Sequence, residues 1–184
     1  MTKKISVSLP LNKYFLDEIF ELGEKITKSF SINLNTNLLC RYHINLFSGK
    51  LYNFNNLRNI IKNIKSYNLN TNLILFGFGI FLKQNPNIHL RFSSENFLLE
   101  IRKSLLTHRE IWKDIDPTTL ENMWVPKSTI FNNNLSIQDD CFVEVLKFLN
   151  SWKFSCRNIY FHEICLIDYE DDMENEIESF NLLK

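Results

Sequence analysis

The sequence predicts an α+β fold with two similar lobes. Short runs in which apolar and polar residues alternate have the length and period of β-strands, and longer runs with apolar residues three or four apart have the period of helices. Each half of the chain places a central strand with a polar-x-polar pair before a helix. No change of composition and no flexible linker divides the 184 residues, so we expect one domain, residues 1–184.

In the first part of the chain, strands and helices are expected to alternate. Lys4–Leu11 alternates and ends near a proline, which predicts a strand, and Lys13–Phe30 has apolar residues at helical spacing. Leu38–Phe47 is typical of a strand and is closed by the turn residues Ser48-Gly49. Asn55–Ser66 then has the pattern of an amphipathic helix.

The middle of the chain is expected to form a hairpin, a helix and a further strand. Leu73–Leu82 and Ile88–Phe92 are apolar runs joined by the turn-rich segment KQNPN. Ser94–Thr107 follows with helical period, whereas His108–Asn122 has no clear pattern and is interrupted by Asp-Pro. Val125–Phe131 is predicted to be a strand, because it follows a proline-containing segment and alternates.

The last part of the chain is expected to contain one helix and two strands. Ile137–Trp152 places apolar residues on one helical stripe, and Asn158–Ile167 is apolar enough for a strand. The acidic segment Asp168–Glu176 is predicted to be a loop, and Ile177–Leu183 a short final strand.

Two of these strands each carry a pair of polar residues on one face. Side chains in a strand alternate between faces, so His43 and Asn45 share a face, which Arg41 joins, while apolar neighbours take the other. Lys127 and Thr129 have the same spacing. Without the second pair, His43 would be interpreted as a partly buried strand histidine. For Lys127 and Thr129, the alternative interpretation is a solvated strand edge.

A third strand adds polar residues of the same kind. In IHLRF, His89 and Arg91 share one face, for which an exposed hairpin face is the alternative interpretation. If the polar faces of the three strands converge, they form a groove with cations, imidazoles and hydroxyls, and a phosphate is the natural ligand for such a groove. Trp124, beside the lysine, is the tryptophan most suited to stack on a base.

The motifs HINL (His43–Leu46) and KSTI (Lys127–Ile130), the second preceded by Trp-x-Pro, resemble the paired His-x-Thr/Ser-x motifs of the 2H phosphoesterases. This family includes the 2′-5′ RNA ligases and cyclic phosphodiesterases, and the resemblance covers nearly the whole chain. It implies two pseudo-symmetric lobes of mainly antiparallel sheet with outer helices and a central groove. It further implies metal-independent chemistry on a nucleotide or RNA end that carries a 2′,3′-cyclic phosphate or a 2′-5′ linkage.

The second motif departs from the family pattern. The resemblance assigns acid or base catalysis to His43 and phosphate binding to Thr129, and Asn45 stands where the family has Thr or Ser. Lys127 stands where the family has its second histidine. An ordinary lysine has a pKa of about 10.4 against about 6.5 for histidine, so it suits a phosphate anchor better than a proton relay.

Two functions therefore stay open, a metal-independent phosphodiesterase of reduced activity and an inactive module that binds a nucleotide or RNA. A third interpretation is an unrelated α+β domain in which the two motifs coincide by chance. The formal net charge of zero gives no whole-molecule argument for nucleic acid or membrane, so an anion site must be local. No cofactor, no metal and no membrane partner is expected, and the four cysteines lack metal-ligand spacing. A cytoplasmic location is expected, because no secretory signal or membrane-length apolar run is found.

Overall fold

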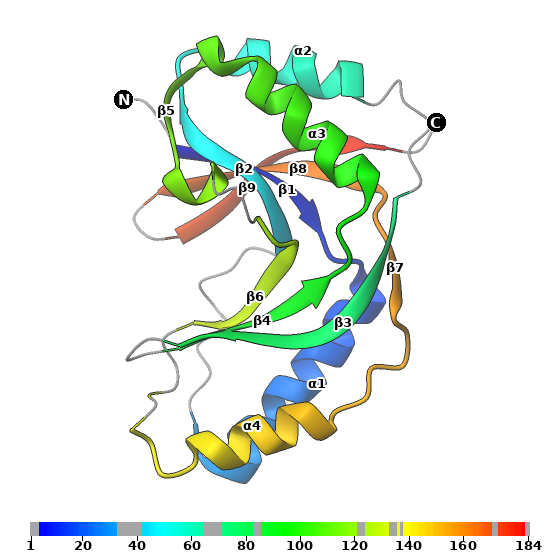
Figure 1. Ribbon diagram of the computed structural model, residues 1–184, viewed down its shortest axis with the longest axis vertical. Helices are drawn as coiled ribbons and strands as arrows, with labels where there is room; N and C mark the ends of the chain where they lie inside the picture. Colours follow the sequence, from blue (N-terminus) through cyan, green and yellow to red (C-terminus); the bar gives the residue numbers. More distant parts are fainter. Residues whose placement is uncertain are drawn as a thin grey trace.

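Two antiparallel sheets and four α-helices make up the described part of the computed structural model, which covers residues 4–32, 42–64, 71–82, 86–120, 124–132, 136, 138–170 and 173–182. The first sheet has the strand order β5-β2-β1-β8-β9, and the second has the order β6-β4-β3-β7 (Figure 1). The arrangement confirms the α+β class that the sequence predicts.

The strands of the first sheet are β1 (Lys4–Pro10), β2 (His43–Leu51), β5 (Trp112–Ile115), β8 (Glu163–Glu170) and β9 (Met173–Asn181). Those of the second are β3 (Asn72–Phe81), β4 (Asn87–Phe92), β6 (Lys127–Asn132) and β7 (Asn158–Tyr160). Segments that are distant in the chain therefore meet in both sheets, since β1 lies between β2 and β8, and β4 between β3 and β6.

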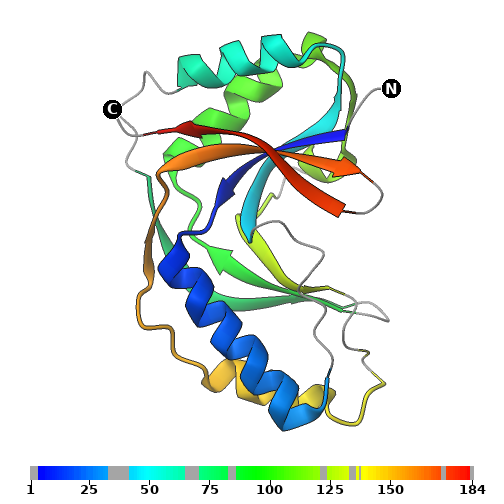
Figure 2. The ribbon, with the colours of Figure 1, turned by 180° about the vertical axis from the view of Figure 1, so that it is seen from behind.

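The helices cover the outer sides of the two sheets (Figures 1 and 2). They are α1 (Lys13–Phe30), α2 (Phe54–Ile64), α3 (Asn96–Thr107) and α4 (Phe142–Ser151). Helices α2 and α3 lie over the first sheet, and α1 and α4 lie beneath the second. None of the described helices is both long enough and apolar enough to pass through a membrane.

Helix α1 illustrates why these segments fold as they do. Its buried residues, among them Phe15, Ile19, Leu22 and Ile26, recur three or four positions apart and form one apolar face. The side chain of Asn12 accepts a hydrogen bond of 3.0 Å from the backbone N–H of Phe15 and caps the helix. Helix α1 therefore begins and ends where its pattern predicts.

The predicted strand Asn158–Ile167 is in fact two strands in different sheets. Strand β7 pairs with β3, and β8 pairs with β1 after the chain has crossed from the second sheet to the first. Phe161, between the two strands, is buried. An apolar run marks burial but not a change of sheet, which is why the pattern suggested one strand.

The prediction of a loop over Asp168–Glu176 is wrong. Strand β8 runs to Glu170, and β9 begins at Met173, so most of the acidic segment is paired in an antiparallel hairpin. Strand β9 lies at the edge of the sheet, where charged side chains can face solvent without cost and protect the edge from pairing with other chains. Acidic composition is therefore compatible with this strand.

Three further boundaries differ from prediction. Strand β2 continues through Gly49, where a Cβ atom would lie 2.4 Å from the carbonyl oxygen of Asp114, so this glycine permits close pairing with β5 and does not end the strand. The unassigned segment His108–Asn122 contains β5 and two 3₁₀ turns, η2 (Arg109–Ile111) and η3 (Pro117–Thr119). Helix α4 begins at Phe142, five residues after the predicted start, and residues 38–41 of the predicted second strand lie outside the described residues.

Candidate functional site

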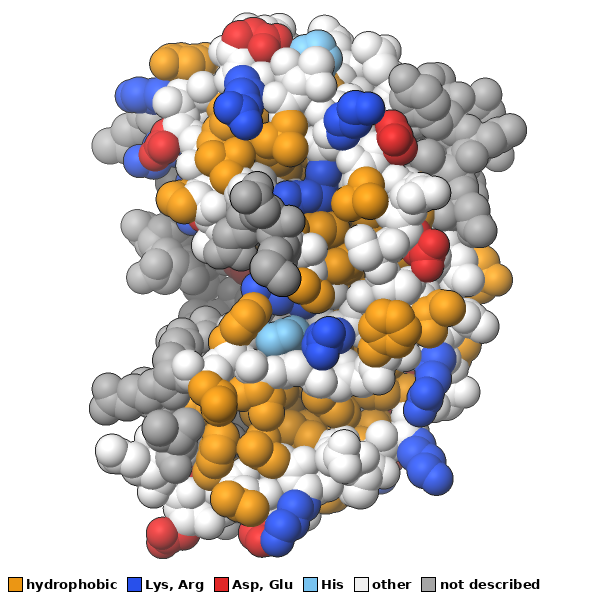
Figure 3. Space-filling model, in the orientation of Figure 1, with side chains coloured by type: hydrophobic (Ala, Val, Ile, Leu, Met, Phe, Trp, Pro, Cys, Tyr) orange, Lys and Arg blue, Asp and Glu red, His pale blue; other side chains and the backbone are white. Residues whose placement is uncertain are grey.

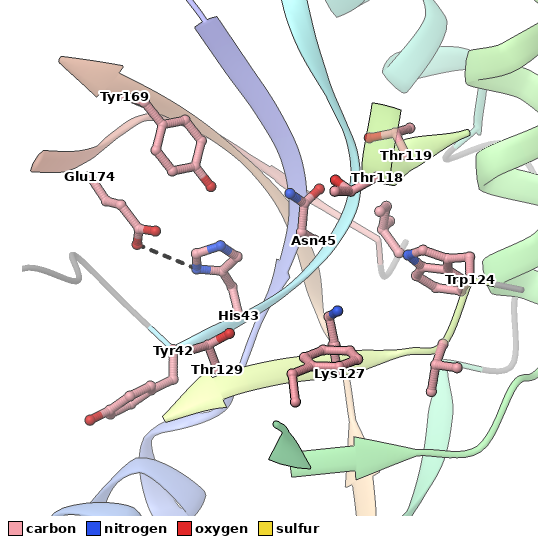
Figure 4. A pocket seen from close by; sticks show the side chains of 13 residues that line it. Tyr42, His43, Asn45, Thr118, Thr119, Trp124, Lys127, Thr129, Tyr169 and Glu174 are labelled. Carbon is pink, nitrogen blue, oxygen red and sulfur yellow. Dashed lines mark ion pairs between the residues drawn. The ribbon is translucent and has the colours of Figure 1, made fainter. Parts of the chain in front are cut away.

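The two sheets enclose a cavity of about 270 Å³ to which both contribute side chains (Figure 4). The predicted site residues that line it are His43, Asn45, Lys127, Thr129 and Trp124. Strands β2 and β6 lie next to each other where the sheets meet, although they are not paired in one sheet. Residues more than 80 positions apart in the chain are thus brought to one site.

The same local pattern directs both pairs of side chains into the cavity. In β2, His43 and Asn45 are partly exposed while Ile44 is fully buried on the other face. In β6, Lys127 and Thr129 are partly exposed while Ser128 is fully buried. Strand alternation, which the sequence showed, therefore holds at both positions.

Glu174 of β9 faces His43 across the end of the cavity. Its Oε2 lies 3.8 Å from Nδ1 of the imidazole, and the two side chains are only 13% and 9% exposed. Burial raises the pKa of the Glu174 carboxyl to about 7, because the charged form is poorly solvated there. A carboxyl whose pKa lies near neutral pH thus stands beside an imidazole.

Lys127 rests on an aromatic ring on the opposite wall. Its Nζ lies 3.9 Å from the centroid of the Phe81 ring, a distance at which the ring quadrupole attracts the ammonium. The same ring is stacked on His89, with 4.7 Å between the centroids. The cation is therefore placed at the cavity wall by contacts that the motif alone did not reveal.

Thr129 is arranged to donate a hydrogen bond into the cavity. The side-chain amide of Asn87 donates to Thr129 Oγ1 at 3.4 Å, which leaves the hydroxyl hydrogen for a ligand, since a hydroxyl has one donor and two acceptor positions. Asn45 contributes a side-chain amide, and its Oδ1 is buried without a hydrogen-bond partner among the described residues. The Thr129 hydroxyl and the side-chain NH2 of Asn45 can therefore donate to a phosphate oxygen, and the Asn45 Oδ1 can accept a hydrogen bond from a sugar hydroxyl.

Arg102 of α3 places a buried positive charge behind the cavity wall. It donates hydrogen bonds to the carbonyl oxygens of Leu46 and Thr119, at 2.5 and 2.7 Å. Its guanidinium carbon lies 4.2 Å from the centroid of the Trp124 ring. All three partners line the cavity. Burial lowers the pKa of Arg102 to about 10, which still leaves it charged at neutral pH.

Arg102 hydrogen-bonds to the Leu46 carbonyl at a β-bulge in strand β2. The pairing of β1 with β2 shifts register between Val7 and Ser8, so that Leu46 has no Cα partner on β1. Such a bulge interrupts the hydrogen bonds of the ladder, and Arg102 supplies a donor to the Leu46 carbonyl. The bulge lies directly after Asn45, within the segment that lines the cavity.

Of the three other predicted site residues, the two that the structure describes, His89 and Arg91, are not among those that line the cavity. Arg41 lies outside the described residues. His89 shares a sheet face with Thr129 but is only 4% exposed, beneath Phe81. Burial, followed by the charge of Lys127, lowers the pKa of His89 to about 4, so it is neutral at pH 7. Arg91, opposite Lys127 in the sheet, is exposed.

Sequence reasoning missed Glu174, Arg102 and the 3₁₀ turn that carries Thr118 and Thr119. Glu174 stood in a segment interpreted as a loop, although a period-two pattern continues from it along β9. Arg102 lies among the buried residues of α3, and an arginine on the apolar stripe of a helix was the signal that could have found it.

Among the residues that the structure describes, no three His, Cys, Asp or Glu side chains are grouped closely enough to hold a metal ion. The side chains that line or lie behind the cavity can themselves supply proton transfer, by imidazole and carboxyl, and charge stabilisation, by ammonium and guanidinium. Searches of protein-family models and of curated proteins found no match to the chain.

Proposed function

We propose that the chain is a 2H phosphoesterase-like protein that recognises the phosphate of a nucleotide or RNA end in this cavity. A 2′,3′-cyclic phosphate or a 2′-5′ linkage is the substrate class that its motifs imply. The observation that carries the proposal is that two polar-x-polar pairs, one from each sheet, line the same cavity. A chance occurrence of the two motifs would not require them to meet.

The charges around the cavity support an anionic ligand. Lys127 lies at one wall, and the buried Arg102 lies behind the other, bonded to carbonyl groups. On the face shown in Figure 3 the described basic and acidic side chains are interspersed, and they form no continuous basic band. The positive charge that would attract a phosphate is therefore local, which agrees with a net charge of zero.

In the proposed reaction, a water oxygen attacks the phosphorus of the cyclic phosphate, and the bond from phosphorus to one ribose oxygen breaks. His43 takes the proton that the water loses and afterwards releases it to solvent, and the ribose oxygen that leaves takes a proton from the Lys127 ammonium, which then recovers one from solvent. Lys127 and Thr129 hold the phosphate oxygens. General acid–base assistance is worth about 10²–10⁴-fold in rate, so a lysine in place of the second histidine predicts slow turnover.

A second candidate function is an inactive module that keeps the phosphate-binding cavity. The observation that favours it is the lysine itself, since an ammonium fixed on the Phe81 ring is suited to hold an anion and poorly suited to exchange protons. The presence of His43 favours the first candidate, because binding alone does not need an imidazole beside a carboxyl.

A turnover assay without metal separates the two candidates. Wild type and His43→Ala are compared on 2′,3′-cyclic nucleotides, 2′-5′ oligoadenylates and RNA that ends in a cyclic phosphate. His108→Ala, which removes an exposed histidine far from the cavity lining, is the matched control. Turnover that is lost only in His43→Ala supports the phosphodiesterase. If the wild type binds a compound of this panel but turns over none of them, the inactive module is supported. If it neither binds nor turns over any of them, both candidates are refuted.

A gain-of-function variant tests the assignment of Lys127. Lys127→His restores the second histidine of the family pattern, so we expect turnover to rise by about 10-fold or more, within the range that general acid–base catalysis supplies. Circular dichroism and thermal unfolding check that the variant is folded. A folded Lys127→His protein with no increase in turnover would contradict the role given to this position.

A further inference from the structure

We infer that Glu174 is the positioning residue of His43, so that the carboxylate holds one ring nitrogen and the other serves the cavity. The catalytic consequence of this pair rests on the proposed function, but its existence does not. The Glu174 carboxyl approaches Nδ1 of the imidazole, and the second ring nitrogen points away from Glu174 toward the side of the cavity where Asn45 lies (Figure 4).

The surroundings of the carboxyl favour the imidazole as its partner. Oε2 of Glu174 is buried and has no hydrogen-bond partner among the described residues, and His43 Nδ1 is 3.8 Å away. A buried carboxylate oxygen without a partner is costly, and an N–H from the imidazole is the donor within reach of a small side-chain rotation. Catalytic hydrogen bonds are often long before a ligand binds, so this separation fits a pair that tightens in the complex.

The other titratable groups near the pair lie on different elements. Tyr169 of β8 stands opposite Glu174 in the hairpin, and Lys127 lines the cavity from β6. Lys4 of β1 is directed to the ring of Tyr169 and to Asp116. Tyr42 lines the cavity beside His43, and burial raises its pKa to about 12, so it stays neutral.

The pair has a defined consequence for proton transfer. A carboxylate on Nδ1 selects the tautomer that carries hydrogen at that nitrogen, which leaves Nε2 as the proton acceptor. An ionised Glu174 also favours the imidazolium, and burial, which raises the pKa of Glu174 to about 7, makes the two groups compete for one proton near neutral pH. A single histidine supported in this way can accept and return a proton.

Histidine NMR tests the inference without any substrate. The chain has four histidines, so each imidazole signal can be assigned by substitution and followed with pH. In the wild type we expect the neutral form of His43 to carry its hydrogen on Nδ1, as judged from the nitrogen shifts. Glu174→Gln should lower the pKa of His43 by about one unit, because an opposite charge within 4–6 Å shifts a pKa by about 1–3 units.

Glu178→Gln is the matched control, since Glu178 lies on the same strand but bonds to Arg58 at the surface. The inference is overturned if the pKa of His43 is the same in Glu174→Gln as in wild type, or if the wild-type ring carries its hydrogen on Nε2. The tautomer in the wild type decides the matter even if the variant does not fold.

The outcomes for the pair and for the proposed function are separable. If the pKa of His43 depends on Glu174 but no panel member is turned over, the pair stands and the phosphodiesterase fails. If the protein is active, the acid limb of its pH–rate profile should move with the pKa of His43 in Glu174→Gln. A limb that does not move would show that Glu174 has only a structural role.

Discussion

The two walls of the cavity have the same alternation of polar and apolar residues but treat charge in opposite ways. On the β2 wall, His43 faces an acid, Glu174, whose pKa burial raises to about 7. On the β6 wall, Lys127 lies on the Phe81 ring, and the histidine beneath that ring is kept neutral by burial and by the lysine. One wall thus places an acid beside an imidazole, and the other places an ammonium on an aromatic ring.

Under the proposed function, this difference explains how the second motif can lack a histidine. A histidine does lie behind the β6 wall, His89 of β4, but it is buried beneath the Phe81 ring and has its pKa lowered to about 4. Lys127 supplies charge to that wall, whereas the acid and the imidazole lie together at the other. In the proposed reaction, the two walls carry between them the roles that two histidines have in the family that the motifs resemble.

The largest expected effect comes from removing the buried cation behind the β2 wall. Arg102→Met deletes two hydrogen bonds from a charged donor, each worth about 1.5–3 kcal/mol, and leaves the Leu46 and Thr119 carbonyls without that donor. We expect the free energy of unfolding to fall by about 4 kcal/mol. Denaturant unfolding measures it, and a phosphate-binding assay on the folded fraction shows whether the loss of charge also weakens the ligand.

Arg58→Met is the control for this change. Arg58 forms a surface ion pair with Glu178 and is 40% exposed, so its loss should cost well under 1 kcal/mol. Arg102→Met could instead lower the free energy of unfolding by no more than Arg58→Met. The hydrogen bonds from Arg102 to the two carbonyls would then not stabilise the β2 wall, which would weaken the contrast between the walls.

A smaller effect on the free energy of unfolding is expected from the titration of His89 as the pH is lowered. The folded state holds this imidazole neutral with a pKa of about 4, while the unfolded chain protonates it near 6.5. Its stabilising contribution is therefore complete above pH 6.5 and is lost as the pH falls to 4, by about 3 kcal/mol. His89→Gln should flatten the unfolding free energy over this range relative to wild type.

The comparison with wild type is needed because Glu174 acts in the opposite sense. Its raised pKa gives a contribution that is complete below pH 4.5 and is lost as the pH rises to about 7. His108→Gln, at an exposed histidine that pairs with Glu110, is the control and should change the pH profile much less than His89→Gln does. A His89→Gln profile parallel to that of wild type would show that His89 is not held neutral.

The smallest expected effect separates binding from proton transfer. Lys127→Met should weaken the binding of a nucleotide phosphate by about 10- to 100-fold, because it removes a charge-assisted hydrogen bond worth about 1.5–3 kcal/mol. His43→Gln should change affinity less, since Gln can still hydrogen-bond. Isothermal titration with a 2′,3′-cyclic nucleotide measures both, and equal losses in the two variants would remove the proposed division between the walls.

Strand alternation is the part of the site that could be predicted. The pairs on β2 and β6 share a face because successive side chains of a strand point to opposite sides, a rule that needs no knowledge of the fold. The α+β class and most of the helices followed from periodicity for the same reason. Glu174 could not be predicted, because its place beside His43 depends on the register of the β8–β9 hairpin and on the order of five strands.

The polar residues of the site, the strand faces they share and the positions of most helices follow from the local sequence. These properties depend on neighbours within a few positions. The tertiary structure alone decided that β2 and β6 meet across a cavity, that His89 is buried below it, and that Arg102 lies behind Trp124. Burial and the distances between groups set their pKa values, and both are properties of segments that are far apart in the chain. The chemistry of the site is thus specified by long-range packing of a locally predictable pattern.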